Sequence, residues 1–73
     1  MGAVAAIGER TRVAGLALAG VVVLVAERPE EVRRAWAELP EGAELVILTP
    51  DAARAVGCEL AEGARPLTVV MPP

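Results

Sequence analysis

Residues 21–49 read VVVLVAERPEEVRRAWAELPEGAELVILT, and this stretch decides the fold class. It begins with an apolar, mostly β-branched run, Val21–Val25, and ends with another apolar run, Leu45–Leu48. Pro29 between them suits the first position of a helix. The residues after it place apolar side chains at i, i+3, i+4 and i+7, which predicts one buried helix face: Val32, Ala35, Trp36 and Leu39. The stretch therefore predicts a strand, a helix and a second strand.

Two further apolar runs flank this unit, Ala3–Ile7 before it and Leu67–Met71 after it. None of the four runs alternates cleanly with polar residues, a pattern typical of strands that are buried on both faces. Residues 11–19 predict a helix, although Ala and Gly dominate them. Thr49 and Pro50 predict the start of another helix that runs to about Glu62, where Gly63 stops it. Gly57 would weaken the interior of that helix by ~1 kcal/mol relative to Ala.

Strands and helices therefore alternate as β-α-β-α-β-α-β over a single domain, residues 1–73. This alternation predicts an α/β fold with a four-stranded parallel sheet and helices on both faces, connected by right-handed crossovers. We expect a doubly wound sheet with strand order 2-1-3-4 and a switch point between strands one and three. Strands two and four then form the edges. The uncharged run Val21–Val25 makes strand two the more adhesive edge, and self-association through an edge or an apolar helix face is expected when no partner is bound.

The composition excludes several function classes. The chain has 73 residues, 55% of them hydrophobic, and a net charge of −3, with Arg and Glu interspersed. It has no His, Lys or Ser, so a Ser-His-Asp triad cannot form, and no metal or other cofactor is expected. The absence of a basic stripe argues against nucleic-acid binding. The only cysteine, Cys58, is interpreted as a partly buried small residue rather than a reactive thiol, and a reducing compartment fits best.

One apolar stretch raises the question of a membrane segment. Val13–Ala26 contains only apolar residues and glycines, and Arg10 and Arg12 precede it as they would in a signal peptide. As a helix it would span ~21 Å, less than the ~30 Å of a bilayer core. Gly20 also marks the point where one element ends and the β-branched run begins. We therefore expect no membrane insertion.

Polar residues follow the predicted strands at the edge where doubly wound sheets bind ligands. The candidate site residues at this edge are Glu9, Arg10, Arg12, Thr49 and Asp51. A phosphate-binding loop needs closely spaced glycines, and only Gly8 is present at the first turn. A phosphorylated receiver domain needs an acidic pair, an Asp after strand three and a Lys, which the chain lacks. The simpler interpretation is that Glu9 and Asp51 are solvated or cap helix ends. Trp36 belongs to the core stripe first, with an interface role as the alternative.

Several short segments, spread along most of the chain, carry a resemblance to a known family. Ile7-Gly8-Glu9-Arg10 followed by Leu18-Ala19-Gly20-Val21 resembles the F subunit of the V/A-type rotary ATPases, as do Arg28-Pro29-Glu30-Glu31 and the strand 45–49 that ends in Thr. The chain departs from this family at Glu9, where Asp is usual, and at Leu16, where Phe is usual. On this resemblance, the C-terminal helical segment that follows the fourth strand in family members is expected to be missing.

The resemblance implies a non-catalytic component of the central stalk that docks on the coiled-coil axle, the D subunit, beside the other rotary ATPase subunits. It also implies a cytoplasmic location, peripheral to the membrane as part of a complex. The five rim residues would then contact the partner. The alternative function is a free-standing doubly wound domain that binds a small anionic ligand at the Glu9/Thr49 rim, or a degenerate signalling receiver.

Overall fold

The computed structural model describes residues 2–57 and 67–72 of the chain. Its central feature is a four-stranded sheet in the order β2-β1-β3-β4, with every pair of neighbours parallel. This confirms the α/β fold and the strand order expected from the sequence. The elements in chain order are β1 (Ala3–Gly8), α1 (Arg10–Val13), the 3-10 helix η1 (Ala14–Ala19), β2 (Val22–Val25), α2 (Pro29–Ala37), β3 (Ala43–Leu48), α3 (Pro50–Val56) and β4 (Leu67–Val70).

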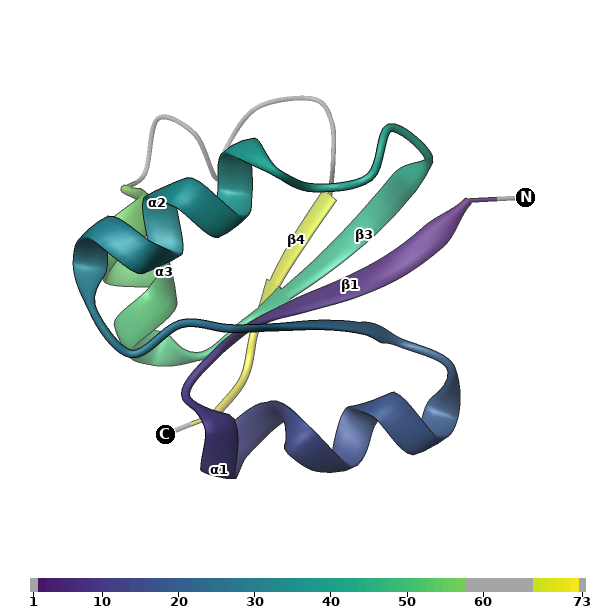
Figure 1. The fold of residues 1–73 in the computed structure, drawn as a ribbon, viewed down its shortest axis with the longest axis horizontal. Helices are drawn as coiled ribbons and strands as arrows, with labels where there is room; N and C mark the ends of the chain where they lie inside the picture. Colours follow the sequence, from purple (N-terminus) through teal and green to yellow (C-terminus); the bar gives the residue numbers. More distant parts are fainter. Residues whose placement is uncertain (1, 58–66, 73) are drawn as a thin grey trace.

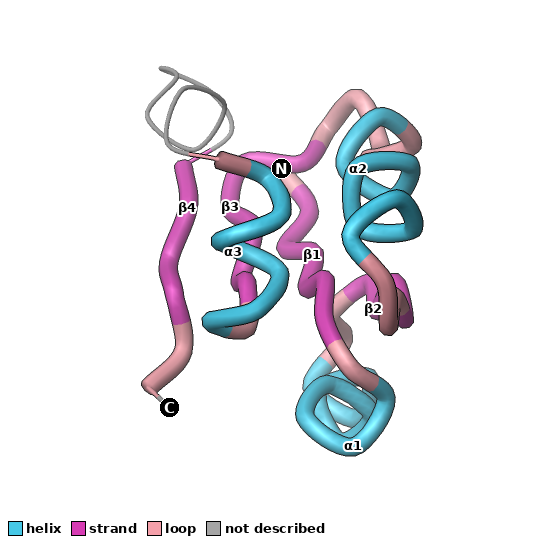
Figure 2. The backbone as a smooth tube through the Cα atoms, turned by 90° about the vertical axis from the view of Figure 1, so that its left-hand side faces the viewer, coloured by secondary structure: helices cyan, strands magenta, loops and turns pink. Residues whose placement is uncertain are grey.

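Helices lie on both faces of the sheet, as Figures 1 and 2 show: α2 and α3 pack together on one face, and α1 with η1 lies on the other. The main core lies under α2 and α3. There Ile7, Val46 and Leu48 of the central strands are buried with Val32 and Ala52 of the two helices. Trp36 packs against this core and is partly buried, which confirms its place in the apolar stripe.

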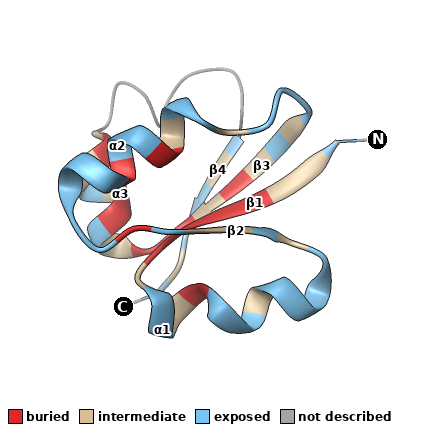
Figure 3. Ribbon diagram, in the orientation of Figure 1, coloured by how far each residue is buried: buried red, intermediate tan, exposed pale blue. Residues whose placement is uncertain are grey.

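The register of the strands decides which side chains share a face. Ala5 pairs with Val46 and Ile7 with Leu48, so these buried residues all face α2 and α3. The intervening residues of the same strands therefore face the α1 side. The central strands are buried most deeply, whereas β2 and β4 at the edges are largely half-exposed or exposed (Figure 3). The prediction that all four apolar runs are buried on both faces was thus wrong for the two edges.

Helix starts follow the sequence closely. Pro29 and Pro50 are the first residues of α2 and α3, and Thr49 caps α3 by accepting a hydrogen bond from the Ala52 amide (3.2 Å). The helix expected over 11–19 is instead one short α-helix followed by η1. None of the η1 residues is buried, so packing does not select α-helical geometry there. Gly20 ends η1 with φ +84°, as its position before the β-branched run predicted.

The predicted extent of the last helix was wrong. The sequence predicted a helix from Pro50 to about Glu62 with Gly57 in its interior, but α3 ends at Val56. Gly57 follows with φ +88° and ψ 154°, a conformation that leaves the helical region and is almost restricted to glycine. Cys58 and the expected stop at Gly63 lie outside the described residues.

Candidate functional site

The structure brings Glu9 and Thr49 together at the C-terminal ends of the two central strands. Thr49 is fully buried, and its hydroxyl donates a hydrogen bond to Glu9 Oε1 (2.7 Å) while it accepts from the Ala52 amide (3.2 Å). The hydroxyl therefore has a donor and an acceptor partner within the chain. The contact joins the end of β1 to the start of α3 and stabilises this edge of the sheet.

A second set of contacts links α1 to the start of α2. The backbone amide of Arg10 donates to Glu27 Oε2 (2.9 Å). The amide of Glu27 donates in turn to Glu31 Oε1 (2.8 Å), and the amide of Arg28 donates to the same oxygen (3.2 Å). The bond from the Glu27 amide contributes most to holding the pKa of Glu31 below its ordinary value of 4.5, and the nearby Arg28 and Arg34 add to the effect.

The remaining rim residues make separate contacts and do not converge with Glu9 and Thr49. Arg12 donates from Nη2 to the carbonyl of Pro72 (2.5 Å), which ties α1 to the segment after β4. Asp51 forms an ion pair with Arg54 on the exposed side of α3. Because both side chains are mostly solvated, this pair adds little to stability. Of the five predicted site residues, only Glu9 and Thr49 are hydrogen-bonded to each other.

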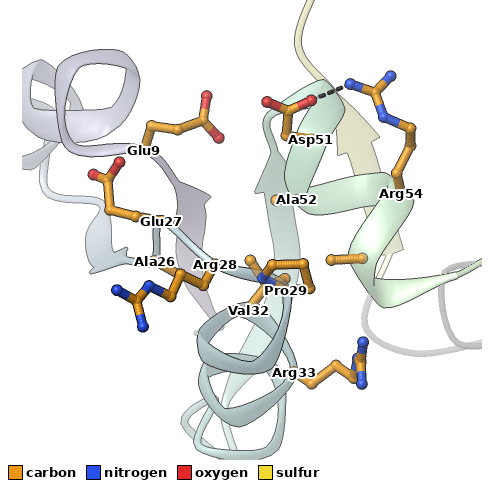
Figure 4. A pocket seen from close by; sticks show the side chains of 11 residues that line it. Glu9, Ala26, Glu27, Arg28, Pro29, Val32, Arg33, Asp51, Ala52 and Arg54 are labelled. Carbon is orange, nitrogen blue, oxygen red and sulfur yellow. Dashed lines mark hydrogen bonds and ion pairs between the residues drawn. The ribbon is translucent and has the colours of Figure 1, made fainter.

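An open pocket of about 460 Å³ lies beside this edge, between α2 and α3. Its charged lining combines predicted and unpredicted residues: Glu9, Glu27, Arg28, Arg33, Asp51 and Arg54. In Figure 4 the guanidinium groups of the three Arg residues point in different directions, and Glu9 and Glu27 lie on the side opposite Asp51. Glu27 follows strand two as Glu9 follows strand one, so the sequence places it at the same edge, although it was not one of the five predicted site residues. Arg33 had no such signal because its placement depends on how α2 packs.

The chemistry available at this edge is limited. Among residues 2–57 and 67–72, no group of His, Cys, Asp and Glu is arranged to hold a metal ion. Within the same part of the chain, every buried side-chain polar atom has a hydrogen-bond partner. The Arg side chains that line the pocket diverge, so they cannot bind one anion together, and the carboxylates beside them would repel an anion.

A second candidate site is the apolar surface on the α1 side of β3 and β4. Register pairs Leu45 with Leu67 and Ile47 with Val69, so these four side chains share the face opposite the main core. We call them the β3–β4 face. Leu67 is 63% exposed and Val69 is 50% exposed. α1 packs against β1 and β2, and β4 packs chiefly against β3 (Figure 2), so this face is left without a principal helix neighbour among the described elements.

Neither a scan of protein-family models nor a search of curated proteins finds a match to this chain. In the part of the chain that the structure describes, no helix has both the length and the apolar character needed to cross a bilayer.

Proposed function

We propose that this chain is a non-catalytic protein-interaction domain that docks on an elongated helical partner through the β3–β4 face. The resemblance to the F subunit of the V/A-type rotary ATPases indicates the partner, the coiled-coil axle or D subunit. The domain would then act in the cytoplasm as a peripheral part of the membrane-bound complex. The observation that carries the proposal is the exposed aliphatic surface formed by Leu67 and Val69 beside Leu45 and Ile47.

A helix is the element that fits this surface. An apolar sheet face is stable when another layer covers it, and in this fold the covering layer is helical wherever it is present. On the same side of the sheet, α1 and η1 cover β1 and β2. On the opposite side, α2 and α3 enclose the main core. A partner helix with an apolar stripe would occupy the equivalent position over β3 and β4.

The polar edge supports this function better than it supports ligand binding. The Thr49 hydroxyl is engaged by Glu9 and by the Ala52 amide, which leaves it poorly placed to receive a ligand. Three carboxylates border the pocket, and the Arg side chains do not converge (Figure 4). We therefore expect calorimetry with ATP, ADP and GTP at millimolar concentrations to show no binding heat. A micromolar dissociation constant for any of these nucleotides would favour the anionic-ligand alternative instead.

The test compares two neighbouring valines that point to opposite faces of the same strand. Val69 lies on the β3–β4 face, whereas Val70 pairs with the core residue Leu48 and faces the α3 side. Their exposed fractions are nearly equal, 50% and 51%, so each should tolerate a polar substitution to a similar degree. Calorimetry would measure how the unmodified chain, Val69→Glu and Val70→Glu bind the purified axle protein of the same organism.

We expect Val69→Glu to weaken binding at least about tenfold, because a carboxylate would be desolvated against an apolar helix. Val70→Glu should bind as the unmodified chain does. Circular dichroism would confirm that both variants keep their helix and sheet content. Absence of binding by the unmodified chain would reject the partner, and loss of binding only in Val70→Glu would reject the face.

A further inference from the structure

Strand β2 forms an edge of the sheet whose outer side has no strand neighbour among the described residues. It contains only Val22, Val23, Leu24 and Val25, and its one sheet neighbour is β1. Val22 is 40% exposed and Val25 is 41% exposed. Proteins usually protect such an edge with a charged residue, a proline or a bulge. None of these interrupts β2.

The direction of the backbone groups along β2 follows from one hydrogen bond. The amide of Ala26 donates to the carbonyl of Gly8 in β1 (2.9 Å). Because backbone groups point to alternate sides of a strand, Val22 and Leu24 direct theirs toward β1 as Ala26 does. Val23 and Val25 therefore direct their N–H and C=O groups outward. These are the groups that a further strand would bind.

The space beside this edge is a groove of about 520 Å³ between β2 and α2. Val23, Leu24 and Val25 contribute apolar side chains to its lining, and Leu24 also packs against the main core. The lining also carries charges of both signs, contributed by Glu27, Glu31 and Glu38 and by Arg10 and Arg34. A surface of mixed charge accepts an identical surface without the strong repulsion that a single sign would produce.

We propose that two copies of this chain pair through β2, antiparallel and related by a twofold axis at Leu24. Side chains alternate between the two faces along a strand, and residues opposite each other in a sheet share a face. Two residues of β2 can therefore pair across the axis only when both residue numbers are odd or both are even. With the axis at Leu24, Val23 of each copy lies opposite Val25 of the other. Both residues direct their backbone groups outward, so each such pair exchanges two N–H···O=C bonds. The two four-stranded sheets then form one continuous sheet.

Two features of this edge favour a second copy of the chain over an unrelated strand as its partner. The cross-strand contacts at this register join Leu24 to Leu24 and Val22 to Ala26, which are apolar pairs without a charged member. Pairing about a twofold axis also covers the β2 edges of both copies at once, so the assembly closes as a dimer. This pairing uses the sheet edge opposite β4 and is independent of the proposed function.

Proline substitutions at the two edges test the pairing. Val25→Pro removes an outward N–H of β2 that the ladder with β1 does not use. Val70→Pro is the matched control: the Met71 amide donates to Leu48 (2.8 Å), so the Val70 N–H likewise points away from the sheet, at the other edge. Sedimentation equilibrium of the full chain and of both variants would be measured from micromolar to millimolar concentration.

We expect the unmodified chain to approach twice its 7.5 kDa mass at the upper concentrations. Val70→Pro should dimerise equally, and Val25→Pro should raise the dimer dissociation constant about tenfold or more, since two hydrogen bonds are lost per dimer. Val25→Lys provides a second variant that keeps the backbone N–H, and it should weaken the dimer as well.

Amide hydrogen exchange identifies the edge directly. In the unmodified chain, exchange at Val23 and Val25 should slow as the concentration rises, whereas exchange at Val70 should not change. A chain that stays monomeric at millimolar concentration would overturn the proposal. So would a dimer that Val70→Pro disrupts and Val25→Pro spares, or one in which the Val23 and Val25 amides gain no protection.

Discussion

Gly8 lies where the end of β1 meets the buried side chain of Thr49. A Cβ atom at Gly8 would lie 2.2 Å from Thr49 Cγ2 and 2.8 Å from its Oγ1. Thr49 cannot easily move away, because it is fully buried and its hydroxyl is bound to Glu9 and to the Ala52 amide. The glycine is therefore required for close approach rather than for an unusual backbone angle.

We expect Gly8→Ala to lower the free energy of unfolding by about 1–3 kcal/mol, the usual cost of overpacking a rigid site. Gly15→Ala is the control, since a Cβ built there meets no atom within 4 Å beyond its chain neighbours and the backbone of its own helix. Urea denaturation of both variants would measure the difference. Equal stability changes in the two variants would contradict the packing argument.

Glu31 makes stability depend on pH at the start of α2. Its carboxylate accepts hydrogen bonds from the amides of Glu27 and Arg28, so its pKa in the folded chain is lowered from 4.5. A lowered folded pKa gives stability that is present above the unfolded pKa and is lost as the pH falls through the folded value. Glu31→Gln should therefore show a smaller loss of stability between pH 7 and pH 3 than the unmodified chain does.

The measurement is thermal denaturation across that pH range, with Glu30→Gln as the control for the removal of one carboxylate from the same helix turn. An NMR titration of the Glu31 carboxyl carbon should have its midpoint below 4.5. A midpoint at or above that value would show that the two amide bonds do not stabilise the charged form.

At the scale of elements, Gly57 decides where α3 ends. The sequence alone predicted that Gly57 weakens a longer helix, so that alanine would stabilise it by ~1 kcal/mol. With φ +88° and ψ 154°, the structure predicts the opposite sign. Gly57→Ala should destabilise the chain by about 1–3 kcal/mol, because a side chain strains this backbone conformation even though the space around it is open. A rise in the melting temperature of Gly57→Ala would instead support the sequence-based prediction of a helix that continues through residue 57.

At the scale of the whole molecule, the core is small. Its buried members include several Ala and Val residues, and only Ile7 and Leu48 are larger aliphatics among the fully buried side chains of the described residues. Leu67, Val69 and Val70 of β4 are at least half exposed. A domain of this size has a limited buried surface, so a partner that covered β4 would add a substantial fraction of the total stability.

We therefore expect the axle protein to stabilise the domain. At a free concentration one hundred times its dissociation constant, it should raise the free energy of unfolding by ~2.7 kcal/mol. For a domain of this length, that corresponds to an increase in melting temperature of roughly 10–20 °C. Differential scanning calorimetry of the mixture measures the shift. Val69→Glu should reduce the shift and Val70→Glu should not, so a nonspecific rise in both variants would count against the β3–β4 face.

The sequence by itself determined the order of the elements and most of their starts. Those signals are local: Pro29 and Pro50 begin helices, Gly20 ends a 3-10 segment, and the apolar runs form strands. The parallel arrangement in the order 2-1-3-4 also followed, because short β-α-β connections and right-handed crossovers leave few alternatives.

Only the tertiary structure decided which of these residues act together. The expected topology placed Glu9 and Thr49 at the same edge, but the hydrogen bond between them and the contact from Arg12 to Pro72 join positions distant in the chain, and no sequence pattern predicted these contacts. The same holds for exposure: Val46 and Val69 both lie in apolar runs, yet the first is fully buried and the second is half exposed. Burial depends on the number of layers that cover a strand, and that number is a property of the packed sheet rather than of the strand itself.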